Sequence, residues 1–277
     1  RVTRRQEYIP RDVYRNAQKQ SHRTNETRQV VTRRRQLGTM QHSDPLQEEQ
    51  FFLTPKHVCS YLNRGDAQTL FYDPRKIITS ETYSRLTKNG FRRSGSHLYR
   101  PRCLECNACT PTRLKVNDYN LRKSDKKTIK KNKDTEVILE DAHFNKRYYH
   151  LYERYIRLKH TDGDMYPPSE DQYKTFLLSN WAESFFLSTY LDKKLISVAV
   201  TDKQSDCLSA VYTFYDPAEN KRSLGTFNIL NQIFLCQQLG LEYLYLGYWI
   251  KANQKMNYKI NFKPTELLLD SEWVTHT

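Results

Sequence analysis

Hydrophobic and polar positions follow two different periods along the second half of the chain, and each predicts its own kind of element. Apolar and β-branched residues dominate three successive runs, at 184–191, 195–201 and 207–215, which indicates three strands. The polar residues 192–194 between the first two runs predict a hairpin. A further apolar run at 243–250 predicts a buried strand. This half of the chain is therefore expected to build a sheet with a meander of antiparallel strands.

Helical spacing marks the segments around these strands. Six residues share one side of a predicted helix, and this stripe is read as core: Phe144, Tyr148, Leu151, Tyr152, Tyr155 and Leu158. Ser169 with Gln172 three residues later forms a capping box that starts another helix. A third helix spans 223–239 and ends at Gly240. Shorter strands are expected at 51–53, 69–72, 112–116 and 267–269, and shorter helices at 81–88, capped by Ser80, and 252–259.

The order of these elements predicts an α+β fold. Two helices, three strands, a helix, a strand, a helix and a strand follow one another after residue 135, which is the layout of the GNAT acyltransferases. We expect a GNAT-like domain at 135–277, with a mixed, largely antiparallel sheet and helices on both faces. A smaller cysteine-bearing N-terminal domain is expected at 50–134, and residues 1–49 are expected to be a disordered or non-native basic extension.

The cofactor loop of GNAT acetyltransferases offers a check on that layout. Those enzymes hold a pyrophosphate on a Q/R-x-x-G-x-G/A loop that opens a helix. Arg222 and Gly225 keep the first half of the pattern, but Phe227 replaces the second small residue. The segment suits a phosphate near the helix start and argues against acetyl-CoA.

Charge points to a polyanionic partner. The formal net charge is +14, and residues 1–40 contribute +8 of it through ten Arg and one Lys against three acidic residues. Lysines and an arginine also dominate residues 122–133, where the run is either a solvated helix or linker or a set of phosphate contacts. No apolar stretch is long enough for a transmembrane helix and no signal peptide is visible, so we expect a cytoplasmic protein with no membrane partner.

Four cysteines are candidates for metal chemistry. Cys103, Cys106 and Cys109 are spaced by three, and Cys59 is a fourth candidate ligand from another loop. Such thiols can bind zinc or an iron–sulfur cluster, and the alternative is reduced structural or redox-responsive thiols. Cys207 and Cys236 are expected in the core. His160, Asp162 and Asp164 resemble a cation site only loosely, and we favour a capped helix end followed by a loop.

One segment combines a buried strand with aromatic and basic residues. The run Tyr245-Leu246-Gly247-Tyr248-Trp249-Ile250 is followed by Lys255-Met256-Asn257-Tyr258-Lys259. Aromatic faces can stack on a base, and lysines can hold phosphate or carboxylate. A core strand with tyrosines at its wet end is the plainer alternative.

Several segments, in this order, resemble the bacterial aspartate/glutamate leucyltransferases, which are relatives of the eukaryotic arginyl-tRNA–protein transferases. The match runs from about residue 50 to residue 270. The segments that carry it are Phe52-Leu53-Thr54-Pro55, Cys59-Ser60-Tyr61-Leu62, Gly90-Phe91-Arg92-Arg93-Ser94-Gly95, Tyr99-Arg100-Pro101, the cysteine cluster, 209–217, 223–226, 243–250 and 255–259.

The resemblance implies an activity. Enzymes of this family move an amino acid, leucine in the bacterial branch, from its charged tRNA to the N-terminal α-amine of a protein that begins with Asp or Glu. The product is marked for degradation. No cofactor is required for the transfer, and the eukaryotic relatives are associated with an iron–sulfur cluster, although the cysteine spacing here differs from theirs.

Roles for individual residues follow as hypotheses from this chemistry. Tyr212 and Tyr248, or main-chain N–H groups after Gly247, are candidate donors to the oxyanion, and Asp216 is the candidate base or orienting group for the amine. The candidate residues for binding the acceptor protein are Arg92, Arg93, Lys255, Tyr258 and Lys259. The candidate tRNA contacts are Lys126, Lys127, Lys130, Lys131, Lys221, Arg222 and Trp249.

Three alternatives remain open at this point. Arginine is the alternative donor, since nothing in the residues themselves selects leucine. An acetyltransferase using acetyl-CoA is a second alternative. A non-catalytic RNA-binding metalloprotein, built on the cysteine cluster and the basic run, is the third.

Overall fold

An eight-stranded sheet organises most of the chain. The computed structural model describes residues 50–62 and 65–276, so the basic extension predicted at 1–49 lies outside the described residues. The strand order in the sheet is β12-β11-β5-β10-β9-β8-β7-β6. Its strands are β5 (Thr110–Lys115), β6 (Thr135–Asp141), β7 (Glu183–Leu191), β8 (Lys194–Lys203), β9 (Cys207–Tyr215), β10 (Tyr243–Trp249), β11 (Thr265–Leu269) and β12 (Glu272–His276).

One parallel pair interrupts an otherwise antiparallel sheet. Strands β6 to β9 form the predicted meander, and a tight turn with positive φ at Asp192 and Lys193 joins β7 to β8. Strand β10 then pairs with β9 in parallel, after a helical crossover, and with β5 in antiparallel. The mixed α+β prediction is confirmed.

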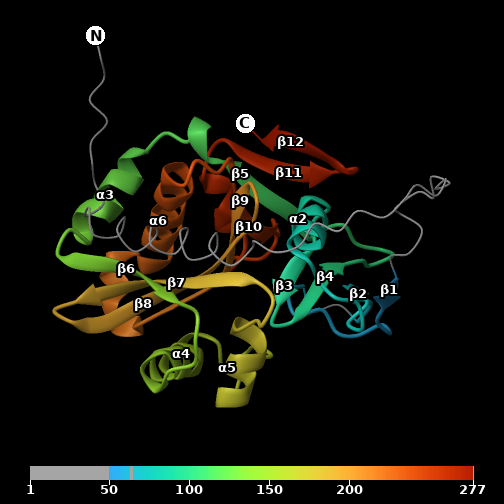
Figure 1. Cartoon of the computed structure of the whole chain (residues 1–277), viewed down its shortest axis with the longest axis horizontal. Coiled ribbons are helices and arrows are strands. Elements are labelled where there is room, and N and C mark those ends of the chain that lie inside the picture. The colour runs from blue at the N-terminus through green and yellow to red at the C-terminus, as the bar shows by residue number, and fades with distance from the viewer. Residues whose placement is uncertain (1–49, 63–64, 277) are drawn as a thin grey trace, which may run out of the picture. The chain divides into compact units, whose positions relative to one another are not determined.

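Helices cover both faces of this sheet (Figure 1). On one face, α6 (Leu224–Gln238) buries Leu230 and Ile233 against the strands, with α3 (Lys123–Lys131) beside it. On the other face, α4 (Lys146–Lys159) and α5 (Glu170–Leu177) pack a tyrosine-rich core. The aromatic stripe of α4 is largely core as predicted, because Tyr148 and Tyr152 are fully buried there, although Leu158 is exposed.

A second, four-stranded sheet has the order β1-β2-β4-β3. Its strands are β1 (Phe51–Leu53), β2 (Thr69–Tyr72), β4 (His97–Pro101) and β3 (Arg92–Ser94), and α2 (Ser80–Lys88) precedes β3. Tyr83 and Leu86 of α2 pack with Tyr72, Phe91 and Leu98 in a small core of their own. The short strands and the helix predicted in this region are confirmed.

The structure departs from the sequence predictions at several further places, and β3 forms where the sequence suggests a loop at 91–95. Thr79 rather than Ser80 caps α2, because its side chain accepts the N–H of Thr82. Only a 3-10 turn, η3 (Asn257–Asn261), forms where a helix was expected at 252–259, and β12 was not predicted. Strand β5, which lies within the predicted N-terminal domain, joins the large sheet between β10 and β11.

Candidate active site

The parallel strands β9 and β10 separate soon after they meet. They pair only from Cys207 to Ser209 and from Tyr243 to Tyr245, whereas β9 continues to Tyr215 and β10 to Trp249. The register of β10 against β5 also shifts between Tyr245 and Gly247. A bulge re-aims a strand locally, so the shift accounts for the separation. The two strands are therefore not paired with each other at their carboxyl ends, and we call this gap in the pairing the opening.

Arg92 of β3 reaches into this opening. Its Nη2 donates to the carbonyl of Ala210, the residue directly after the paired stretch of β9. Gly247, at φ +86°, lies on the other side, and a Cβ there would be 3.6 Å from Arg92 Nε. The side chain is only 8% exposed, and its Nη1 has no hydrogen-bond partner within the described residues. Since a buried guanidinium N–H group without a partner is costly, Arg92 is a candidate anion site.

Lys259 lies close to Arg92. The turn η3 buries it to 5% exposure, and its Nζ donates to the carbonyl of Tyr248 at 2.7 Å, with Met256 Sδ at 3.3 Å. Burial and then the like charge of Arg92 lower the pKa of Lys259 to about 7. Much of this amine is therefore uncharged at neutral pH.

The two candidate tyrosines have different surroundings. Tyr248 donates its hydroxyl to the carbonyl of Gly90 at 2.9 Å, and burial raises its pKa well above the usual value. Tyr212 packs against the rings of Phe176 and Tyr152, and its hydroxyl is buried with no partner among the described residues. Of the two, Tyr212 keeps a hydroxyl that is free to donate.

Aromatic residues surround the end of the opening. Tyr215 of β9 lies 4.8 Å from Tyr155 of α4, measured between ring centroids, and Tyr155 lies 5.0 Å from His160. Tyr258 is 40% exposed. Trp249, at the end of β10, donates its indole N–H to the carbonyl of Asn257.

Two tyrosines near this site, Tyr61 and Tyr99, were not predicted. Burial raises the pKa of each, and each is influenced by its neighbour Cys109. Both occur in segments that carry the family resemblance, but nothing in their local pattern indicates a position near the opening.

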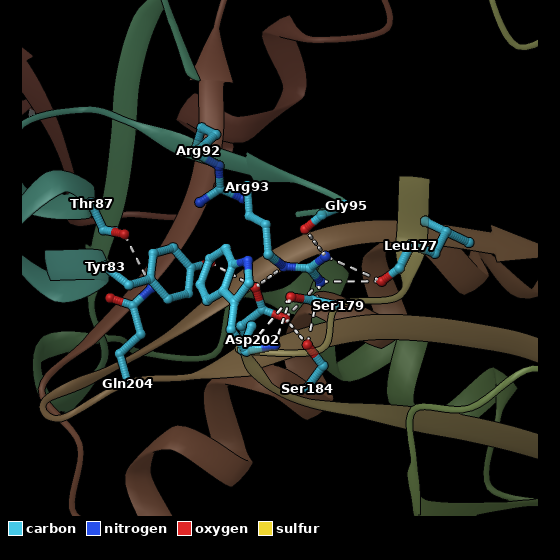
Figure 2. A network of polar contacts seen from close by, with 12 residues as sticks. Tyr83, Thr87, Arg92, Arg93, Gly95, Leu177, Ser179, Ser184, Asp202 and Gln204 are labelled. Carbon is cyan, nitrogen blue, oxygen red and sulfur yellow. Dashed lines mark hydrogen bonds and ion pairs between the residues drawn. The ribbon is translucent and has the colours of Figure 1, made fainter. Parts of the chain in front are cut away.

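Other predicted residues are committed to partners elsewhere. Adjacent residues of a strand point to opposite faces, so Arg93 points away from Arg92. Arg93 forms a fully buried ion pair with Asp202 at 2.6 Å (Nε to Oδ2), and Tyr83 and Ser184 donate to the same carboxylate (Figure 2). This network links β3 to β8. Each side-chain nitrogen of Arg93 already donates a hydrogen bond within it, so Arg93 is not available to bind an anion in the opening.

Asp216 and Lys255 are also paired. Asp216 caps η2 (Pro217–Arg222) by accepting the N–H of Ala218, and it forms ion pairs with Lys194 and Arg154. Lys255 binds Asp162 on the surface. The structure does not bring either of them into contact with Arg92.

Comparison with known proteins places this chain in a family. The family described as "Arginine-tRNA-protein transferase, C terminus" matches residues 147–269, and "Arginine-tRNA-protein transferase, N terminus" matches residues 57–127. A curated protein of Hahella chejuensis, named aspartate/glutamate leucyltransferase, is 47% identical over 81% of this chain and 96% of its own length. One of Pseudomonas fluorescens with the same name is 50% identical over 81% of this chain and 95% of its own.

The chain belongs to the arginyl-tRNA–protein transferase family. It is therefore an aminoacyl-tRNA transferase, as the sequence predicts. Among solved structures, the chain is similar to one titled "The structure of L-PGS from Bacillus licheniformis", at 9% identity and a TM-score of 0.42, over 76% of this chain and 71% of that one.

Within this transferase, the predicted tRNA contacts divide into exposed and paired residues. Asp125 and Thr128 lie on the buried side of α3, whereas Lys126, Lys127 and Lys130 are exposed. Next to them, a shallow cavity of about 490 Å³ is lined by Lys131, Lys221, Arg222 and residues 218–220 of η2. Arg222 is bound to Asp134 and Glu219, so its charge is largely compensated.

The cysteines do not form a recognisable metal centre in this transferase. Burial first, and then the thiols of Cys59, Cys103 and Cys106, raise the pKa of Cys109 to about 12, so the four lie near one another. Yet across residues 50–62 and 65–276 no three His, Cys, Asp or Glu side chains are arranged to hold a metal ion. The fit of zinc or an iron–sulfur cluster is therefore not supported, and no step of the chemistry is derived through one. Cys207 and Cys236 are buried core residues, as predicted.

The segment after α4 agrees with the interpretation as a capped helix end followed by a loop, rather than a cation site. His160 is the C-cap residue of α4, and Asp162 binds Lys255, while Asp164 accepts from the hydroxyl of Ser60. In the part of the chain that the structure describes, no helix is long and apolar enough to cross a membrane.

Proposed function

We propose that the protein transfers leucine from Leu-tRNA to the N-terminal α-amine of proteins that begin with Asp or Glu, and thereby marks them for degradation. The observation that carries the proposal is the buried Arg92 without a carboxylate partner among the described residues, at the strand opening of a chain whose relatives are named for this activity. An acidic N-terminal residue supplies the missing anion. Arg93 and Lys255 are poorer candidates because each already has a carboxylate.

The reaction asks for positioning more than for activation. The aminoacyl ester is already activated, so the transfer needs neither ATP nor a cofactor. Holding the amine against the ester carbonyl can contribute about 7–11 kcal/mol of the barrier in well-oriented systems. With the acceptor carboxylate on Arg92, the α-amine of the same residue lies only two or three carbon atoms away, beside Lys259.

The ester carbonyl needs a donor for its developing negative charge. Tyr212 is a better candidate for this donor than Tyr248. The hydroxyl of Tyr212 has no partner among the described residues, whereas that of Tyr248 is bound to the carbonyl of Gly90. Main-chain N–H groups of β9 and β10 beyond their last paired residues are further candidates. Asp216 is left with a structural role because two cations and a helix cap occupy it.

The exposed lysines of α3 are proposed to bind the tRNA backbone. Lys126, Lys127, Lys130, Lys131 and Lys221 form a basic surface on α3 and the adjoining η2, which are joined by a bond from Lys131 Nζ to the carbonyl of Lys221. Neutralised phosphates release counterions, so such a surface gives affinity that falls with salt. Trp249 and Tyr258 offer rings on which the terminal base can stack.

We further propose a GNAT-like architecture for residues 135–277. The support is a parallel strand pair that separates at its carboxyl end, with the proposed chemistry in the gap. The region 50–134 supplies the acceptor cation Arg92 and the lysines of α3.

The test is a transfer assay with purified protein. Labelled Leu-tRNA or Arg-tRNA is incubated with reporters that differ only in a first residue of Asp, Glu, Asn, Lys or Ala. The expected result is leucine on the Asp and Glu reporters only. Transfer from Arg-tRNA alone would make the protein an arginyltransferase, and tRNA binding with no transfer from either donor would overturn the proposal.

A further inference from the structure

Lys259 is a buried lysine without an acidic partner among the described residues. In the described part of the chain it forms no ion pair, and its Nζ faces a main-chain carbonyl and a thioether. A buried ammonium normally requires a carboxylate, as Arg93 has in Asp202. The surroundings of Lys259 favour an amine that can take up a proton rather than a permanent charge.

The ring centroid of Tyr258 lies 5.7 Å from Lys259 Nζ, and two further titratable groups face this amine. One is the positively charged guanidinium of Arg92, which repels a second positive charge. The other is the thiol of Cys109, which is uncharged at neutral pH because its pKa is raised to about 12. Burial lowers the pKa of Lys259 most, and the charge of Arg92 lowers it further, so compensation of that charge is the change that a bound anion can bring about.

We propose that the carboxylate of an acidic acceptor, once bound by Arg92, turns Lys259 into the general base for the α-ammonium of that same acceptor. This inference rests on the proposed function. A carboxylate on Arg92 cancels the repulsion and adds a negative charge near Lys259, so the affinity of the amine for a proton rises. Lys259 takes a proton from the α-ammonium of the acceptor within the site. The loss of this proton allows the amine to attack the ester.

The proton and electron balance of the step is simple. One N–H bond of the α-ammonium breaks and a new N–H bond forms on Lys259 Nζ, which leaves a neutral amine with a free electron pair. This pair forms the C–N bond to the ester carbonyl carbon, and the C–O bond to the ribose breaks. The second proton of the attacking nitrogen goes to the departing ribose oxygen, and Lys259 later releases its proton to solvent.

This arrangement makes acceptor recognition part of catalysis. An N-terminal Gln or Asn has nearly the shape of Glu or Asp but brings no negative charge to Arg92. Such an acceptor leaves Lys259 with its low proton affinity and is expected to lose turnover, kcat, as well as binding. A plain binding role for Arg92 would change KM alone.

Proton uptake on ligand binding tests the inference without tRNA. The probe is a peptide with an N-terminal succinyl group, which is aspartate lacking its α-amine, and the control probe is the corresponding succinamyl peptide. Binding is measured by calorimetry at pH 7.5 in buffers of different ionisation enthalpy. For a rise in pKa of about one unit, uptake on the order of half a proton per site is expected with the succinyl probe and none with the amide.

Variants test whether Lys259 is the group that takes up the proton when the succinyl probe binds. In K259M it should vanish, while in K263M, at an exposed lysine four residues away, it should persist. Binding of the succinyl probe without proton uptake by the wild type, or equal uptake by K259M, would overturn the inference and leave the transfer activity standing. Failure of the probe to bind would overturn both the inference and the role of Arg92, whereas the proposed transfer would still be judged by its own assay. The comparison of the two probes on the wild type needs no variant to fold.

Discussion

Arg92 Nη2 donates to the main-chain carbonyl of Ala210, at the point where β9 has just left its parallel partner β10. A side chain from the small sheet thus occupies the place where the large sheet opens. The guanidinium gains a carbonyl but no carboxylate within the described residues, which leaves it ready for an anion. This relationship underlies the assignment of the acceptor site.

The neighbouring Arg93 predicts a stability effect rather than a catalytic one. Its ion pair with Asp202 has no exposed surface on either side chain, so Asp202→Asn or Arg93→Met leaves a buried charge or donor set uncompensated. Such losses cost about 3–5 kcal/mol in the free energy of unfolding. Urea denaturation should show this loss, whereas Lys203→Met, which breaks the exposed pair with Glu183, should cost under about 1 kcal/mol. Equal effects of the two changes would contradict the account.

The basic surface predicts a salt-dependent contribution to tRNA binding. Replacing Lys126, Lys127 and Lys130 by Gln should raise KM for Leu-tRNA severalfold with little change in kcat, and should flatten the dependence of affinity on salt. The matched control replaces three exposed lysines elsewhere, Lys76, Lys193 and Lys263. If both triple variants behave alike, the lysines of α3 are ordinary solvated surface.

Burial of Lys259 predicts a pH dependence of stability. Its pKa in the folded protein is about 7, below the value of about 10.4 in an unfolded chain. Between these values the unfolded state binds the extra proton, so the contribution of this lysine to stability rises with pH across the window from 7 to about 10. When the unfolding free energies of the wild type and K259M are measured at half-unit steps of pH, the value for the wild type should rise relative to that for K259M as the pH rises. A constant difference would mean that the amine is charged in the folded state.

Much of the fold could be predicted because it depends on patterns among residues that are close together in the sequence. The strands of the meander, the capping box at Ser169 and the core positions of Tyr148 and Tyr152 depend on periodicity and local hydrogen bonds. The edge strand β12 escaped prediction because its burial is one-sided and weak, and the place of β5 in the large sheet depends on contacts far along the chain.

The site was less predictable because charged residues look alike in a sequence. Arg92 and Arg93 are adjacent, yet only the structure shows that one has a buried carboxylate and the other has none among the described residues. Asp216 had the right chemistry for a base, but Lys194 and Arg154 reach it from distant elements. Lys259 was predicted to bind substrate, but its low proton affinity follows from burial beside β10 and from the charge of Arg92, neither of which its local sequence shows.

If the guanidinium of Arg92 selects acidic acceptors, kcat/KM for leucine transfer should differ between reporters that begin with Glu and reporters that begin with Gln. The wild type should prefer Glu by about 100-fold or more, as expected when a buried charge is left unpaired by the neutral analogue. In R92M this ratio should fall to near one, while R100M, at an arginine of β4 bound to the carbonyl of Asn89, should retain it. A wild-type ratio near one, or an unchanged preference for Glu in an R92M enzyme that still transfers leucine, would contradict the account.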